Sequence, residues 1–479
     1  MAGQRPSLSL GDVSQWVVGS GRRPRNRSTS RLAVWPVACA IQQPLGRIRF
    51  NAGGRPVSDG TLDMSKQASH RFVSRKALPP TLYDPARHER LTSTPWSDTA
   101  AADAILRIAE DAAARFDPDA LWPTHPMDEP RDADPYCMLY FGAAGVIDAL
   151  RRLAAAGTPF TPRAFEPTVA ALLERNRVRT RTWDEEVPSL LMGDVGILLF
   201  QWQVAPSRAI ADAIFGAVER NLRNRTLEQL WGSPGTLLAS IHMFERTGEP
   251  RWSDLLARGV TILWEQMEHV PEAGLWLWRQ DIHGRHIVRY LGGGHGFAGN
   301  VFPALRGAHM LPTDLVAGYT QRTEETLRAT ALRDARLANW PDRLPLPGQG
   351  PATTRVQDCH GAPGIVCRLP NHAVPALDDL LLEAGELVWQ AGPLVKGAGL
   401  CHGTAGNGYT FLKLYRRSGD TRWLERARAF AMHAIEQCDS AAATYGQRRY
   451  SLWTGDPGVA LFLQGCRLAD DAYPTLDVF

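Results

Sequence analysis

Apolar segments recur along this chain behind the same four-residue turn. Gly-x-x-Gly occurs seven times, spaced 39 to 65 residues apart, and each copy leads into an apolar run such as Val146-Ile147. One such turn means little, because glycine is common at turns and helix ends. Seven copies at this period predict a repeat architecture whose unit is a helical hairpin. The copies begin at Gly142, Gly193, Gly232, Gly296, Gly361, Gly403 and Gly455.

Segments with one polar and one apolar face alternate with these glycine-opened runs, which is typical of surface helices. They are expected at 206–220, 252–268, 313–335, 376–389 and 421–438, after a first helix at 100–116 that Ser97 could cap. The glycine-opened runs are shorter and apolar all round, which suits burial. The pattern therefore predicts two concentric layers of helices. If the inner helices are parallel, their N-termini converge on one pocket, where glycine allows crowding and positive φ angles.

Composition is that of an ordinary globular protein. The 479 residues are 44% hydrophobic and 22% charged, with a formal charge of +3, which gives no reason to expect nucleic-acid binding. This length would suit two to four domains, unless a closed repeat array uses most of the chain. No apolar run approaches the roughly 18 to 20 residues of a membrane-spanning helix, so no transmembrane segment is expected.

The first 50 residues differ from the rest, with eight arginines and a single acidic residue. Their formal charge is +7, whereas that of the whole chain is +3, so the other 429 residues carry −4. Such a leader resembles a transit peptide, and 32–41 resembles a signal peptide, although Pro36 interrupts its apolar run. A poorly ordered tail, or an upstream extension before a working start at Met64, is favoured. We expect a basic extension over 1–92 and the repeat fold over 93–479.

The seven cysteines are odd in number and too sparse for a secreted disulfide framework. We therefore predict reduced thiols and a cytoplasmic location. Some of these cysteines should be metal ligands and others core residues. They are Cys39, Cys137, Cys359, Cys367, Cys401, Cys438 and Cys466.

Three consecutive turns carry candidate chemistry directly before their first glycine: His295, then Cys359-His360, then Cys401-His402. Helix dipoles at a shared pocket would favour thiolates. Because Zn²⁺ takes Cys and His ligands, we predict one zinc ion per chain on Cys359, Cys401 and His402, with a fourth position open. Buried structural thiols are the alternative for the cysteines. His360 either completes a closed Cys₂His₂ site or lines the pocket, and His295 is a candidate general acid/base or a structural histidine.

Residues 95–479 resemble the LanC-like proteins, relatives of the lanthionine synthetase C cyclases. The resemblance rests on 295–299, 339–341, 359–364, 396–409 and 451–455. It implies an all-α fold, an α/α toroid of seven helical hairpins with the Gly-x-x-Gly turns opening the inner helices. It also implies zinc on the three ligands above. The implied reaction adds a thiol to a dehydroalanine or dehydrobutyrine side chain of a peptide or protein.

The resemblance also assigns roles around the metal. His295 corresponds to the family's acid/base and Arg355 to its pocket arginine, while Glu228 falls where the family carries an acid. An exposed residue early in a helix is the alternative for Glu228. Lys396 occupies the place of a lysine associated with glutathione in the stand-alone LanC-like proteins. The alternative for Lys396 is a solvated lysine at a helix end.

Two residues depart from the cyclase pattern. Lanthionine cyclases usually have Trp before the first zinc cysteine and often Tyr after it, where this chain has Asp358 and His360. His360, together with the segment 339–341, is more similar to the glutathione-using proteins. We therefore take His360, Lys396 and Asp358 as candidate substrate-binding residues, although the charge of Asp358 would disfavour an anionic substrate.

The implied function is zinc-dependent addition of glutathione or of a peptide cysteine to dehydroamino acids. The alternatives are a dedicated lanthionine-ring cyclase and a non-catalytic zinc protein that binds a peptide or thiol. Two other toroid classes fit less well. A prenyltransferase-like subunit would need an aspartate ligand, and a glycoside hydrolase would need two catalytic carboxylates where this chain offers thiols and imidazoles.

Overall fold

The computed structural model describes residues 81–128, 135–161, 164–180, 187–282, 284 and 286–479. All of them belong to the second of two compact units, residues 45–479. The first unit, residues 1–44, and the predicted start at Met64 lie outside the described residues, as do the arginine-rich leader and its possible targeting signals.

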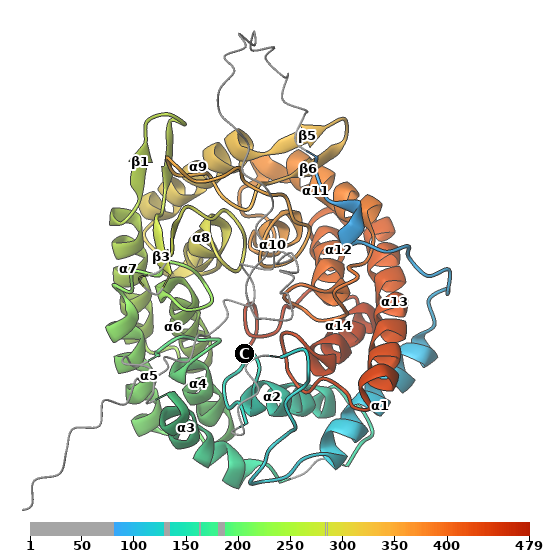
Figure 1. The fold of residues 1–479 in the computed structure, drawn as a ribbon. Helices are drawn as coiled ribbons and strands as arrows, with labels where there is room; N and C mark the ends of the chain where they lie inside the picture. The colour runs from blue at the N-terminus through green and yellow to red at the C-terminus, as the bar shows by residue number, and fades with distance from the viewer. Residues whose placement is uncertain (1–80, 129–134, 162–163, 181–186, 283, 285) are drawn as a thin grey trace, which may run out of the picture. The chain divides into compact units, whose positions relative to one another are not determined.

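Within the described residues, fourteen α-helices alternate along the chain between an inner and an outer layer (Figure 1). The inner helices are α2 (Ala143–Ala155), α4 (Asp194–Val204), α6 (Ser233–Thr247), α8 (Phe297–Arg306), α10 (Ala362–Cys367), α12 (Thr404–Ser418) and α14 (Asp456–Leu468). The outer helices are α1 (Asp98–Ala114), α3 (Glu166–Thr180), α5 (Arg208–Asn221), α7 (Pro250–Glu265), α9 (Thr313–Thr330), α11 (Asp378–Ala391) and α13 (Thr421–Tyr445). Each inner helix contacts the next, and α14 contacts α2, so the inner layer closes on itself. The predicted α/α toroid of seven helical hairpins is confirmed.

Three short antiparallel hairpins interrupt the helical pattern, and the sequence did not predict them. The pairs are β1 (Glu268–Val270) with β2 (Leu275–Leu277), β3 (Gln280–Ile282) with β4 (His286–Val288), and β5 (Leu332–Asp334) with β6 (Leu337–Asn339). Two predicted helix ends were therefore wrong. The chain leaves α7 at Glu265 and α9 at Thr330 to enter β1 and β5. Helix α3 was also not predicted, because its mixed polar sequence gives little helical periodicity.

The seven glycine turns have one structure. The first glycine of every Gly-x-x-Gly is the N-cap of an inner helix. The second glycine packs on the carbonyl oxygen six residues before it, and a Cβ there would lie 1.7 Å from that oxygen at Gly364 and Gly406. Close approach therefore explains the repeat. The expected positive φ occurs at only one of the seven N-cap glycines, Gly361, where φ is 96°.

The loop before each turn folds back over the start of its own helix. The amide of Phe297 donates to the Tyr290 carbonyl, and that of Thr404 to the Gly397 carbonyl, each over 3.0 Å. These bonds satisfy amides that otherwise have no partner in the first turn of a helix. The residues between loop and turn are thereby fixed, and they include the candidate ligands.

The C-terminal segment, residues 470–479, ends near the centre of the ring (Figure 1) and contacts the residues at which two inner helices finish. Arg246, at the end of α6, donates to the Phe479 carbonyl over 2.8 Å. Arg306, at the end of α8, donates to the Asp477 carbonyl over 3.1 Å. Because Tyr473 and Thr475 are fully buried, this segment forms part of the core.

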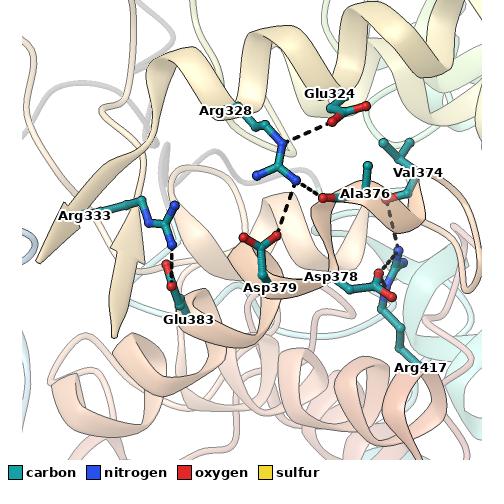
Figure 2. A network of polar contacts seen from close by, with 9 residues as sticks. All are labelled: Glu324, Arg328, Arg333, Val374, Ala376, Asp378, Asp379, Glu383 and Arg417. Carbon is teal, nitrogen blue, oxygen red and sulfur yellow. Dashed lines mark hydrogen bonds and ion pairs between the residues drawn. The ribbon is translucent and has the colours of Figure 1, made fainter. Parts of the chain in front are cut away.

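Ion pairs join neighbouring outer helices at the surface (Figure 2). Arg328 on α9 lies between Glu324, at 3.1 Å, and Asp379 of α11, at 3.4 Å. Beside it, Arg333 of β5 reaches Glu383 of α11 at 2.5 Å. Exposed pairs of this kind contribute little each, but they connect the hairpins on either side of the strand insertion.

Residues 81–97 lie against the ring, although 81–92 fall within the predicted extension. The Glu89 amide donates to the Pro393 carbonyl over 2.9 Å, and the Val395 amide donates to the Arg87 carbonyl over 3.2 Å. A short 3-10 helix, Pro85–Arg87, lies in this segment, and two others, Ala308–Met310 and Pro375–Leu377, follow α8 and precede α11. In the described part of the chain, no helix combines the length and apolar character needed to cross a bilayer.

Candidate metal centre

Two capping loops bring the candidate thiols together at the helix N-termini. Cys359 lies before α10 and Cys401 before α12, in adjacent repeats. The Cys359 amide donates to the Cys401 carbonyl over 3.2 Å, and the Cys401 amide donates to the Trp453 carbonyl of the next repeat over 2.9 Å. Loop-to-loop hydrogen bonds around the ring therefore set the separation of the two thiols.

The predicted ligands fit a zinc ion. One ligand atom each from Cys359, Cys401 and His402 lies within 4.8 Å of the others. Tetrahedral zinc, with bonds of about 2.0 to 2.3 Å, places its ligand atoms about 3.5 to 3.8 Å apart. The cysteines are 1% and 4% exposed, and His402 is half-buried. Burial lowers the pKa of His402, which favours the neutral imidazole that binds metals.

Other described cysteines lie in the core, as expected. Burial raises the pKa of the Cys367, Cys438 and Cys466 thiols, which suits inert core residues.

Gln357 contacts the cluster directly and Arg87 contacts Gln357, and the sequence predicted neither. The Gln357 side-chain amide donates to the Cys359 sulfur over 2.9 Å, and Arg87 donates to the Gln357 side-chain oxygen over 3.0 Å. Hydrogen bonds of this kind orient a metal ligand. Gln357 was detectable only as a neighbour of Cys359. Arg87 gave no signal, because it lies 272 residues away in the predicted extension.

His295 forms a buried pair with Glu228. The His295 Nδ1 lies 2.7 Å from the Glu228 carboxylate, and the side chains are 7% and 0% exposed. With Nδ1–H donating to the carboxylate, Nε2 carries the lone pair. A ring nitrogen of His295 lies within 4.8 Å of the Cys359 sulfur. An oriented imidazole therefore adjoins the thiol cluster.

The turn before α6 holds Glu228 in place. The Trp231 amide donates to its carboxylate over 2.5 Å, and the preceding residue, Leu227, has a left-handed φ of 47°. A bulky residue in that region is strained, and such strain is found at functional sites. The alternative reading of Glu228 as an exposed residue is wrong, because the side chain is fully buried.

His360 stacks on the acid/base candidate. Its ring centroid lies 5.3 Å from that of His295, at an interplanar angle of 29°, and 5.0 Å from that of Tyr290. Burial lowers the pKa of His360 to about 3, so the ring is neutral. Its ligand atom groups with those of His295 and Cys359, rather than with Cys401 and His402.

Two predicted cations lie half-buried at the same end of the ring. The charge of Arg355 contributes to the lowered pKa of His360, which burial and the charge of His295 lower more. The charge of Lys396 likewise contributes to the lowered pKa of His402. Both cations therefore act on the site electrostatically.

Asp358 is paired beneath the cluster. Arg368, in the turn that ends α10, donates two hydrogen bonds of 2.8 Å to its carboxylate and a third of 2.8 Å to Gln229. Burial raises the pKa of Asp358, and the Arg368 charge opposes that shift. The negative charge that Asp358 brings next to Cys359 is thus matched by a guanidinium. Asp358 and Arg368 line one small pocket with His295, Cys359 and Cys401.

These features define a class of protein: an α/α toroid with a Cys₂His cluster at the inner-helix N-termini, beside a carboxylate-bound histidine. The chain belongs to the lanthionine synthetase C-like protein family, whose model matches residues 137–477. The fold, by itself, is similar to that of nisin cyclase, with a TM-score of 0.54 and 14% identity over 78% of this chain and 98% of that one.

Two curated relatives match part of the chain. Glutathione S-transferase LANCL1 of Danio rerio is 32% identical over 183 residues, 36% of this chain and 42% of the relative. LanC-like protein GCL1 of Arabidopsis thaliana is 32% identical over 203 residues, 40% of this chain and 44% of the relative. The chain therefore spans less than half the length of the curated relatives it matches.

Proposed function

We propose that this protein adds a thiol to dehydroalanine or dehydrobutyrine side chains of a peptide or protein. The observation that carries the proposal is the cluster of Cys359, Cys401 and His402 beside the His295–Glu228 pair. A soft-metal site and an oriented proton carrier are the two components that thiol addition to an activated double bond requires.

We propose zinc as the metal held by Cys359, Cys401 and His402. When bound there, zinc lowers the pKa of a substrate thiol and keeps its sulfur nucleophilic. The two cysteine thiolates balance the charge of the ion, and Gln357 fixes one of them by its hydrogen bond.

His295 carries the proton in this proposal. As the thiolate sulfur bonds to the β-carbon, the double-bond electron pair moves onto the neighbouring carbonyl and gives an enolate, whose α-carbon must then take a proton. The Glu228 carboxylate holds Nδ1–H, so Nε2 can accept the thiol proton and return it to that carbon. Arg355 supplies positive charge for the enolate oxygen.

We propose glutathione as the thiol donor. The support is the similarity to a relative named glutathione S-transferase and the position of Lys396, whose charge reaches His402. An ammonium group there could pair with a glutathione carboxylate. We also propose a cytoplasmic location, where thiols stay reduced, and a toroid domain preceded by a basic extension.

Metal content and adduct formation test the proposal on the same samples. Wild type, Cys401→Ala and the core-thiol control Cys466→Ala are analysed for zinc, then incubated with glutathione and a dehydroalanine peptide, with mass spectrometry as readout. Purified without added zinc, wild type and the control should hold zinc and form a glutathione adduct, and Cys401→Ala should do neither.

Other outcomes would redirect or end the proposal. Zinc without an adduct, but with ring closure of a peptide that carries its own cysteine, identifies a lanthionine cyclase. Zinc with neither product identifies a binding module. Absence of zinc from wild type overturns the site.

A further inference from the structure

A second group of metal-ligand atoms adjoins the first. One atom each from His295, Cys359 and His360 lies within 4.8 Å of the others, and all three residues are buried. Cys359 belongs to both groups. The second group therefore combines one thiolate with two imidazoles, a donor set that suits zinc.

The His295–Glu228 pair has the geometry of a metal-ligating histidine. Such histidines donate their other ring N–H to a carboxylate, which fixes the ring and strengthens the ligand nitrogen. Here the Nδ1-to-carboxylate distance is 2.7 Å, so Nε2 is the ring nitrogen that Glu228 does not engage.

His360 supplies an independent observation. The residue is 1% exposed, and its Nδ1 is buried without a hydrogen-bond partner among the described residues. A buried polar nitrogen without a partner is costly, and a bound ion is one of the ways to satisfy it. The ring stacks on His295, so both imidazoles border the same space beside Cys359.

We propose that His295, Cys359 and His360 form a second zinc position, filled when zinc exceeds one ion per chain, with the Cys359 thiolate shared between two ions. The inference rests on the proposed zinc position at Cys359, Cys401 and His402. Since the second position has no thiolate of its own, it binds zinc more weakly than the first. Its occupancy takes the His295 lone pair away from proton transfer, so excess zinc turns the reaction off.

A zinc titration of the metal-free full-length protein, with bound zinc measured by mass spectrometry, separates the two positions. We expect two ions in wild type, one in His360→Ala, one in Cys401→Ala and none in Cys359→Ala. His309→Ala, which removes an exposed histidine elsewhere, should still bind two. Glu228→Gln should weaken the second ion by about 10- to 100-fold and leave the first unchanged, because only the second uses His295.

Each failure has its own pattern. One ion in wild type and in His360→Ala, with none in Cys401→Ala, overturns the second position and retains the first. One ion in wild type and in Cys401→Ala, with none in His360→Ala, overturns the first position and with it the shared thiolate. The rate of adduct formation is also measured for each protein with and without excess zinc. Excess zinc should lower the rate of wild type and leave the rate of His360→Ala at its own zinc-limited value.

Discussion

Arg368 and Asp358 form a two-pronged ion pair, with two hydrogen bonds of 2.8 Å, directly beneath the candidate metal centre. Both side chains are buried, to 0% and 1% exposure. The pair adjoins Cys359 in sequence, and the carboxylate also interacts with Tyr473 of the C-terminal segment. It therefore links the metal-binding loop to the C-terminal segment.

Removal of one partner should be costly. In Arg368→Met the Asp358 carboxylate stays buried without its counter-charge, and we expect the free energy of unfolding to fall by about 3 to 5 kcal/mol. Asp358→Leu combined with Arg368→Met should recover most of that loss. Urea unfolding measures the stability of the single and the double variant. Arg333→Met, which breaks the exposed pair with Glu383, is the control, and its unfolding midpoint should stay near that of wild type. Equal losses in the single and double variants would contradict the pairing.

Loss of the proton carrier should separate catalysis from metal binding. We expect His295→Asn to slow adduct formation by about 100-fold or more, because general acid–base catalysis contributes at least that much. Glu228→Gln should slow it less, since the ring remains but loses its orienting charge. The first zinc ion should stay bound in both, by metal analysis. Full activity in His295→Asn would remove this residue from the mechanism, and Glu324→Gln, on the surface of α9, is the matched control.

The second glycine of a turn should be irreplaceable. A Cβ at Gly364 would lie 1.7 Å from the Asp358 carbonyl oxygen, so Gly364→Ala must displace the loop that carries Cys359. We expect the free energy of unfolding to fall by about 4 kcal/mol or more, and zinc to be lost. A Cβ at Gly216, in the middle of α5, would meet only the end of an arginine side chain, at 3.3 Å. Gly216→Ala should therefore raise the free energy of unfolding by about 0.5 to 1 kcal/mol. Similar thermal shifts in the two variants would refute the close-approach explanation.

Acid should destabilise the ring through His242, which lies far from the metal-binding residues in sequence. Burial lowers its pKa to about 3 from an ordinary value of 6.5. The unfolded chain therefore binds a proton below pH 6.5 that the folded chain does not, and stability falls as the pH drops toward 3. Between about pH 7.5 and pH 5 this amounts to about 2 kcal/mol.

His242→Leu should abolish that component of the pH dependence, as measured by urea unfolding at several pH values. The exposed His309→Leu serves as control and should leave the slope unchanged. An unaltered slope in His242→Leu would mean that the histidine is accessible to protons in the folded state.

The sequence by itself determined the repeat, the inner-helix starts and the three candidate zinc ligands. These depend on local geometry: each loop packs closely against the start of its own helix, so a fixed offset from Gly-x-x-Gly places Cys359, Cys401 and His402 at one end of the ring. The strand hairpins were not predicted, because each strand has only three residues, which is too few to show a periodic pattern.

Only the tertiary structure decided which residues surround those ligands. Glu228 reaches His295 across 67 positions, and Arg87 reaches Gln357 across 270. Arg368, at the end of α10, contacts Asp358 and Gln229, and no pattern in the sequence indicates that contact. Such partners depend on how the ring closes and on which side chains neighbouring repeats direct toward its axis. Periodicity along the chain specifies the hairpin, whereas contacts between hairpins arise when all seven pack together.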